Sequence, residues 1–313
     1  MIISASRRTD IPAFYSDWFF NRIKERYVLV RNPMNYRQIS KVNLSPEVVD
    51  CIVFWTKNPE PILAKLDKLK DYNFYFQFTL TPYAQDVELS LPAKGCLIES
   101  FKRLATKIGP EKVIWRYDPI FLNQKYTLEY HIEYFEKMAK QLKDYTEKCT
   151  ISFLDFYPKI KSNIKALGIT EMNPEQQWRL AENLAKIAFA YGLKLDTCCE
   201  KIDLSELGIG HAKCIDDELI SRIVGSPLKV EKDKNQRLEC GCVSSIDIGL
   251  YNTCCHGCKY CYANHSLASV QKNRQQYDPE SPLLCSQVGP DDIIHEREVR
   301  SLKDGQLNLL FTN

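Results

Sequence analysis

The sequence predicts an α/β protein organised as a partial or full (β/α) barrel. Short runs of β-branched and aromatic residues recur along the 313-residue chain, and most are followed by a stretch in which apolar residues fall three or four positions apart. The chain is also long enough, at 44% hydrophobic residues, to bury one barrel core of about 200 to 250 residues. These two observations favour a single main domain.

Seven segments are predicted to be core strands, at residues 2–6, 51–56, 73–80, 112–117, 149–155, 192–197 and 243–250. Helices are predicted between them, where apolar side chains share one face, at residues 15–23, 63–69, 97–108, 132–142 and 178–188. Thr127 is the expected N-cap of the fourth helix, and Asn173 with Pro174 begins the fifth.

Two segments interrupt the alternation of strands and helices. Residues 27–44 are predicted to form a hairpin that turns near Asn32 and Pro33, and residues 225–239 form a charged loop. Beyond Cys261 we expect a short helix and then a tail, ending in LNLLFTN, that wraps the domain. The predicted division is therefore a barrel with its cysteine-containing loop over 1–265 and a packed helix and tail over 266–313.

Charge and hydropathy narrow the class of protein. The formal net charge is +2, which gives no indication of nucleic-acid binding but leaves that class open. The apolar run in the N-terminal segment MIISASRRTDIP is too short for a signal peptide. No later stretch approaches the roughly 18 apolar residues of a membrane span. We therefore expect a cytoplasmic protein without membrane contact, whose thirteen cysteines bind metal or do chemistry rather than form disulfides.

Polar residues follow several predicted strands, at the positions where α/β barrels carry their active sites. The expected ligand contacts are Arg7, Arg8, Asp10, Lys57, Thr79, Arg116 and Asp118. Charged side chains gathered at one mouth suit an anionic or zwitterionic ligand, because arginine can grip a carboxylate with two hydrogen bonds. The alternative is that these groups are structural, with Arg116 and Asp118 forming an ordinary ion pair.

The last predicted strand runs into YNTCCHGCKYCYANH, in which Cys254, Cys258 and Cys261 have the spacing C-x-x-x-C-x-x-C. Three thiolates from one loop can bind three irons of a [4Fe–4S] cluster, whereas a fully ligated cluster needs four cysteines. The fourth iron would then be free for another ligand.

This triad, with the aromatic Tyr260 before its third cysteine, resembles the cluster-binding loop of the radical S-adenosylmethionine (radical SAM) superfamily. NTCCHGCKYCYA is also similar to the loop of its spore photoproduct lyase branch. Through SRRTDIPAFY, VFWTKNP, IWRYDPI and the cysteine loop, most of the chain resembles a bacterial family known only as a domain of unknown function.

The superfamily resemblance implies that the free iron binds S-adenosylmethionine, whose reductive cleavage gives a 5′-deoxyadenosyl radical that abstracts hydrogen from an unknown substrate. It implies a reductant such as flavodoxin or ferredoxin, and it adds Tyr260 to the cofactor-binding residues. The superfamily's loop usually follows the first strand, so its place after the last predicted strand implies a circular permutation, with residues 243–250 beside residues 2–6. The usual Gly-Gly-Glu motif is absent, and Arg7, Arg8 or Asp10 is expected in its place.

Other interpretations of the same cysteines stay open. Zinc could be bound by Cys255, Cys258, Cys261 and either His256 or His265. A ferredoxin-type motif would need a fourth cysteine at position 265, where the chain has His, and unligated thiols are the remaining choice. The competing function is a zinc- or iron–sulfur-stabilised binding module, for example for nucleic acid, without radical chemistry.

A second cysteine group is scattered over the later loops, at Cys198, Cys199, Cys214, Cys240 and Cys242. Strand ends and loops of one barrel mouth can bring such residues together, which would make a second iron–sulfur cluster or a zinc site. The alternative is that they are small buried hydrophobic residues.

Overall fold

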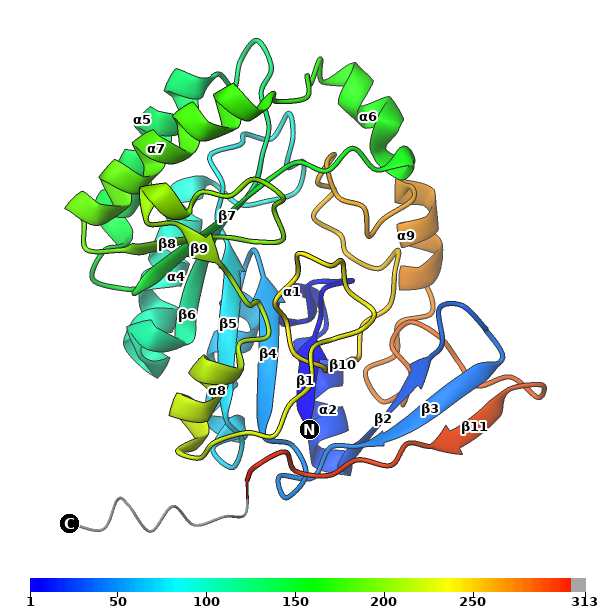
Figure 1. The fold of residues 1–313 in the computed structure, drawn as a ribbon. Coiled ribbons are helices and arrows are strands. Elements are labelled where there is room, and N and C mark those ends of the chain that lie inside the picture. Colours follow the sequence, from blue (N-terminus) through cyan, green and yellow to red (C-terminus); the bar gives the residue numbers. More distant parts are fainter. Residues whose placement is uncertain (305–313) are drawn as a thin grey trace, which may run out of the picture.

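The computed structural model describes residues 1–304, so the predicted LNLLFTN tail segment lies outside the described residues. Its centre is a sheet of eight parallel strands (Figure 1). In spatial order these are β10 (Ile246–Asp247), β1 (Ile2–Ala5), β4 (Cys51–Thr56), β5 (Phe74–Thr79), β6 (Val113–Ile120), β7 (Lys148–Phe153), β8 (Lys194–Thr197) and β9 (Gly210–His211). The predicted α/β class is confirmed, and all seven predicted core strands are present.

The pairing of the first and last predicted strands is confirmed as well. Strand β10 lies parallel to β1, with Ile246 opposite Ile3 and Asp247 opposite Ser4. It is much shorter than the predicted segment 243–250, and the two-residue strand β9 at the other edge was not predicted. Within residues 1–304 no pairing joins β10 to β9, so the structure shows a parallel sheet and does not show a closed barrel.

Helices and short turns connect the strands. The α-helices are α1 (Ile11–Phe14), α2 (Ser16–Glu25), α3 (Glu60–Leu63), α4 (Lys94–Ile108), α5 (Leu128–Leu142), α6 (Lys161–Ala166), α7 (Pro174–Ala190), α8 (Asp217–Val224) and α9 (Leu267–Arg274). The 3₁₀ turns are η1 (Leu66–Leu69), η2 (Pro110–Lys112), η3 (Pro158–Ile160) and η4 (Ser205–Leu207). Both predicted caps are confirmed: Thr127 accepts from the N–H of Tyr130, and Asn173 forms a capping box with Gln176.

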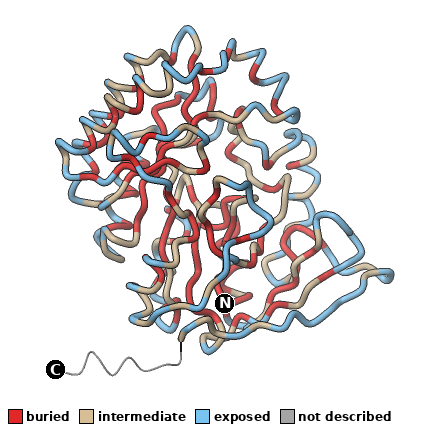
Figure 2. The backbone as a smooth tube through the Cα atoms, viewed as in Figure 1, coloured by how far each residue is buried: buried red, intermediate tan, exposed pale blue. Residues whose placement is uncertain are grey.

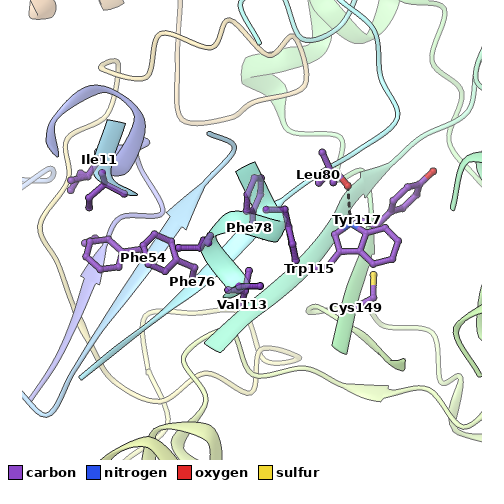
Figure 3. Packing of buried hydrophobic residues seen from close by; sticks show 14 of the residues in the cluster. Ile11, Phe54, Phe76, Phe78, Leu80, Val113, Trp115, Tyr117 and Cys149 are labelled. Carbon is purple, nitrogen blue, oxygen red and sulfur yellow. Dashed lines mark hydrogen bonds between the residues drawn. The ribbon is translucent and has the colours of Figure 1, made fainter. Parts of the chain in front are cut away.

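One face of the sheet packs against α2, α4, α5 and α7 to form the main core, and the strands of the sheet are mostly coloured as buried in Figure 2. Aromatic side chains fill it. Phe54 and Phe76 stack with ring centroids 4.7 Å apart, and the buried Trp115 donates its indole N–H to the carbonyl of Leu80 at 2.9 Å (Figure 3). Burial of such large rings supplies much of the hydrophobic stabilisation of the fold.

The opposite face of the sheet is polar in its middle. Its apolar end packs against α8, but Gln77, Arg116, Thr150 and Asp196 are each 5% exposed or less. Strands of parallel sheets are normally apolar on both faces, so buried polar groups there require hydrogen-bonding partners and mark a site rather than a core. Two of these polar side chains contact a cysteine residue: Gln77 donates to the carbonyl of Cys214, and Arg116 donates to its sulfur.

A small second sheet lies beside the main one, with β11 (Ile293–Glu296), β3 (Gln38–Asn43) and β2 (Tyr27–Arg31) in that order (Figure 1). The antiparallel pair β2–β3 confirms the predicted hairpin. Strand β11, which adds to β3 in parallel, was not predicted. Arg31 of β2 forms a bidentate ion pair with Asp292, at 2.7 and 2.8 Å, which fixes the segment just before β11.

The chain after the cysteine loop begins with the predicted helix, α9, which Ser266 caps. It then runs back along the domain. Trp18 donates to the carbonyl of Ser281 at 2.9 Å, and the N-terminal amine of Met1 donates to the carbonyl of Arg300 at 2.7 Å. Among the described residues, none of the helices has the length and apolar character needed to cross a membrane.

Candidate metal centre

The segment that follows β10, residues 251–264, is called the cysteine loop here. The carboxyl ends of parallel strands lie at one edge of a sheet, so the loop starts at the edge where the ends of β1 and β4 also lie (Figure 1). The N–H of Asn252 donates to the carbonyl of Ala263 at 3.0 Å, and the side chain of Asn264 donates to the carbonyl of Cys254 at 2.8 Å. These contacts close the loop on itself.

Three cysteines of the loop lie together. The pKa of the Cys254 thiol is raised far above its ordinary value, first by burial and then by Asp10, Cys261 and Cys258. Burial also raises the pKa of Cys258, to about 12, and that of Cys261. The three thiols therefore carry their protons in the metal-free protein, and metal binding would have to release them.

Cys255 is separated from this group. The guanidinium of Arg274 in α9 donates to its sulfur at 2.9 Å, and its own thiol points back to the carbonyl of Thr253 at 3.6 Å. Its other electrostatic neighbours are Tyr15 and Cys285, behind the loop. Cys254 is thus an electrostatic neighbour of Cys258 and Cys261, while Cys255 contacts Arg274 and Thr253.

A buried carboxylate anchors the cysteine loop. Glu88 is 1% exposed and accepts hydrogen bonds from Lys57 at 2.8 Å and from Lys94 and Tyr260. Its backbone pairs with that of Cys258 in an isolated β-bridge. Although burial works against ionisation, the two lysines hold the pKa of Glu88 down at about 2.

Two residues that were predicted to contact a ligand instead form hydrogen bonds within the protein. Lys57 and Tyr260 both bond to Glu88, and the Lys57 ammonium lies 5.4 Å from the centre of the Tyr260 ring. Glu88 itself was missed in the sequence, because a glutamate in an irregular segment looks like an ordinary solvated charge. The unusual length of the chain between β5 and α4 was the one signal, since long connections in compact domains are often functional.

Asp10 connects three segments: α1, the end of β4 and the cysteine loop. One oxygen caps α1 by accepting from the N–H of Ala13 at 2.9 Å; the other accepts from the N–H of Lys57 at 2.7 Å and contacts His256 of the cysteine loop at 2.7 Å. Both oxygens are occupied, so Asp10 holds the loop in place rather than offering itself to a ligand. The buried Nδ1 of His256 has no hydrogen-bond partner in residues 1–304.

The two adjacent arginines face different neighbours. Arg8 lies over the ring of Tyr251 at 5.2 Å and 3.9 Å from Asp247 of β10. Arg7 lies over Trp55 at 5.3 Å and 3.9 Å from Asp233. Asp247 also accepts from Ser4, Ser6 and the N–H of Arg7, so it joins β10 to β1, a role that sequence reasoning missed.

The remaining predicted residues lie farther along the sheet edge. Arg116 pairs with Asp118, as the structural alternative predicted, and Asp118 also accepts from Ser152. Arg116 has a further contact, donating to the sulfur of Cys214 at 2.9 Å. Thr79 lies at the end of β5 opposite Arg116 in the strand register and is partly buried.

Four members of the second cysteine group form what is called the thiol row here, in the order Cys198, Cys214, Cys242 and Cys240. The sulfurs of Cys198 and Cys214 are 3.2 Å apart, and Cys242 lies within hydrogen-bonding reach of both Cys214 and Cys240. Hydrogen bonds from Cys198 and Cys242 hold the pKa of Cys214 well below its ordinary value, and a hydrogen bond from Cys242 lowers that of Cys240 to about 6.

The fifth predicted member, Cys199, departs from the row. Its backbone is left-handed, at φ +60°, and its neighbours include Arg237, to which it is hydrogen-bonded. The next residue, Glu200, accepts from the N–H of Phe153 at 2.8 Å. Burial raises the pKa of Glu200 to about 7, so this carboxylate is poised to exchange a proton near neutral pH.

Neither cysteine group has the geometry of a finished single-ion site. Over residues 1–304, no three side chains of His, Cys, Asp or Glu are arranged so that they could hold one metal ion. The loop thiols have the chemistry that a [4Fe–4S] cluster requires, because such a cluster takes anionic sulfur ligands and each thiolate binds a different iron. The N–H groups of His256 and Ala263, which donate to Cys254 and Cys261, would stabilise thiolate charge there.

Fold and site together define a parallel α/β protein with two groups of free thiols near the strand ends. The family described as domain of unknown function (DUF1848) matches residues 2–263, and the chain belongs to this family. The match includes β1, the whole parallel sheet and the cysteine triad. No curated protein and no solved structure matches the sequence.

Proposed function

We propose that this protein is a radical SAM enzyme in which Cys254, Cys258 and Cys261 bind a [4Fe–4S] cluster. The observation that carries the proposal is the sorting of the loop cysteines: these three lie together while Cys255 turns to Arg274. That selection reproduces the C-x-x-x-C-x-x-C set and leaves one iron of a cluster without a cysteine. When bound, the cluster and S-adenosylmethionine would supply one-electron chemistry leading to hydrogen abstraction from a substrate.

The sheet topology supports a circularly permuted barrel as the scaffold of this enzyme. In the proposed arrangement, β10 takes the place of the first strand, with the cysteine loop directly after it, and β1 takes the place of the second. Gly249 sits where β10 and the turn after β1 come closest, because a Cβ there would lie 2.0 Å from the hydroxyl oxygen of Ser6. The close approach keeps the loop next to the first residues of the chain.

The residues of this chain would divide the binding tasks. Glu88, Asp10 and His256 fix the shape of the cysteine loop, and the ammonium of Lys57 faces Cys258 and favours its thiolate. Arg8, which lies beside the loop with a partly exposed guanidinium, is the cation best placed for the carboxylate of S-adenosylmethionine. Asp10 does not take that part, since both its oxygens already accept hydrogen bonds.

Metal analysis of matched variants tests the cluster. Protein purified without oxygen is expected to be brown and to contain iron and acid-labile sulfide, and Cys258→Ala is expected to lose about four irons per chain relative to the wild type. Cys255→Ala is the matched control, because its thiol lies outside the triad, and it should retain the wild-type iron content. Equal iron content in Cys258→Ala and the wild type would overturn the ligand assignment.

A second measurement tests the chemistry. The intact protein, given a strong one-electron reductant and S-adenosylmethionine, is expected to release 5′-deoxyadenosine, measured by chromatography and mass spectrometry. Cys258→Ala should release none. An iron-loaded wild-type protein that releases none either would show that the loop binds a cluster for another purpose.

A further inference from the structure

The thiol row is assembled by the fold from three separate segments. Cys198 directly follows β8, Cys214 precedes α8, and Cys240 with Cys242 precedes β10. Their side chains nevertheless lie in a row, each in contact with the next. The sulfurs of Cys198 and Cys214 are 3.2 Å apart, Cys214 contacts Cys242, and Cys242 contacts Cys240. Four thiols, each in contact with the next, form a group of soft metal ligands.

Buried positive charge faces the row. Arg116 is 5% exposed and donates to the sulfur of Cys214 at 2.9 Å. Arg7 is an electrostatic neighbour of Cys214, Cys240 and Cys242, and its buried Nη2 has no hydrogen-bond partner within the described part of the chain. This unsatisfied guanidinium nitrogen favours anionic sulfur beside it, and metal binding would make all four thiols anionic.

The charges around the row suit an anionic metal centre. Four thiolates around Zn²⁺, or around a [4Fe–4S] cluster in its 2+ state, carry a net charge of about −2, and Arg7 and Arg116 would offset part of it while also contacting Asp233 and Asp118. Cysteines that only fill space look different in this protein. Cys51 of β4 shares an apolar cluster with Cys214, Cys240 and Cys242, but its thiol donates to the carbonyl of Ile52 and not to another sulfur.

We propose that Cys198, Cys214, Cys240 and Cys242 form a second metal site, which takes a thiophilic centre: a zinc ion or an iron–sulfur cluster. The row is the metal-free arrangement. Since its thiols do not yet converge on one point, the side chains of Cys198 and Cys240 at its two ends have to rotate inward on metal binding. Arg7 and Arg116 then compensate part of the charge of the centre, and the thiol protons are released to solvent.

The test removes the other metal site first, so that its outcome is independent of the proposed radical chemistry. A full-length variant with Cys254→Ala, Cys258→Ala and Cys261→Ala is purified without oxygen. One portion is incubated with Zn²⁺ and another with sulfide and equal amounts of ferrous and ferric iron, and unbound metal is removed. We expect about one zinc, or about four irons with sulfide and visible colour, per chain. The portion that retains metal tells which centre the site takes.

Two further substitutions in this background identify the ligands. Cys214→Ser, at the middle of the row, is expected to lose most of the retained metal, and Cys199→Ser is the matched control that keeps it, since Cys199 lies outside the row. If Cys214→Ser does not fold, metal-edge X-ray absorption of the parent variant gives the answer, with sulfur as the neighbour of the metal. Retention of no metal in either portion, or equal metal in Cys214→Ser and its parent, overturns the proposal.

Discussion

The cysteine loop and the thiol row bring sulfur atoms together by different means. The loop supplies Cys254, Cys258 and Cys261 from one continuous segment, so their spacing in the sequence already restricts how they can lie. The row draws on three segments that are distant in the sequence, after β8, before α8 and before β10, and they meet only because the fold brings them to one face of the sheet. A motif search can therefore find the first group, whereas the second is visible in the sequence only as scattered cysteines, and the fold shows that Cys199 is not part of it.

The two groups also differ in charge. Burial keeps the loop thiols protonated, with the pKa of Cys258 at about 12, and the nearby Lys57 is already paired with Glu88. In the row, by contrast, hydrogen bonds from Cys242 lower the pKa of Cys240 to about 6, and Arg116 faces Cys214. In the row, Cys214 and Cys240 therefore ionise readily while Cys198 and Cys242 keep their protons until metal binds, whereas all three loop thiols become thiolates only as metal binds.

Alkylation of the metal-free protein tests this contrast and should give the largest effect. At pH 7.5 Cys240, with a pKa of about 6, is mostly thiolate, whereas only about one Cys258 in 30,000 is, because its pKa is about 12. Because thiolates are the reactive form, we expect iodoacetamide to modify Cys240 at least about 100 times faster than Cys258. Peptide mass spectrometry over a time course measures both rates.

In this experiment solvent exposure favours modification of Cys258, whereas ionisation favours modification of Cys240. The faster of the two rates therefore shows which factor governs reactivity. Cys258 is the more exposed of the two, while Cys240 is 7% exposed. Faster modification of Cys258 would mean that access rather than ionisation governs the thiols, and the contrast between the two groups would fail. Cys96, which is exposed on α4, serves as an internal reference for an accessible thiol.

The anchor of the loop should give the next largest effect. Glu88→Gln leaves the ammonium groups of Lys57 and Lys94 facing a neutral amide in a buried position, and we expect it to lower the free energy of unfolding at pH 7 by about 3 to 5 kcal/mol. Urea denaturation measures it. Glu99→Gln is the control, an exposed helix residue paired with Lys102, with an expected loss below about 1 kcal/mol.

The pH dependence of that effect follows from the pKa of Glu88. The folded protein lowers this pKa from 4.5 to about 2, so the folded state binds the proton less tightly than the unfolded state does. The stability it contributes is complete above pH 4.5 and is lost as the pH falls towards 2. The difference between the wild type and Glu88→Gln should therefore shrink in acid, and a difference that stays constant from pH 7 to pH 3 would contradict this account.

Most of the fold could be predicted from the sequence because parallel strands and amphipathic helices have distinct periodicities. Residues 51–56 and β4 coincide, and the capping residues Thr127 and Asn173 were found from their side-chain chemistry. The short edge strands β9 and β11 were missed. Two or four exposed residues leave no hydrophobic pattern, and their pairing depends on neighbours far away in the sequence.

The cysteines of both groups could be predicted from the sequence, but the long-range partners of the other site residues could not. The spacing of the loop cysteines favoured Cys254 over Cys255, and the structure brings Cys254 together with Cys258 and Cys261. That Asp10 and Lys57 would be used by protein contacts could not be predicted, because their partners His256 and Glu88 lie 246 and 31 residues away along the chain. Long-range hydrogen bonds have no signature in local sequence.

The smallest effect we predict concerns Glu200, on the segment that carries Cys198. Its pKa is raised from 4.5 to about 7 by burial, so the folded state holds the proton more tightly than the unfolded state. Glu200 therefore lowers stability progressively as the pH rises from 4.5 to 7, opposite in sign to Glu88.

Glu200→Gln imitates the protonated side chain and keeps an acceptor for the N–H of Phe153, so it removes the destabilisation that ionised Glu200 causes. We expect it to raise the free energy of unfolding by about 1 to 2 kcal/mol at pH 8 and by almost nothing at pH 4.5. Urea denaturation at the two pH values measures the difference, with the exposed Glu206→Gln as control. A loss of stability at pH 8 would mean that the ionised carboxylate has a partner beside the thiol row. The effects of Glu200 and Glu88 on the free energy of unfolding would then no longer have opposite signs.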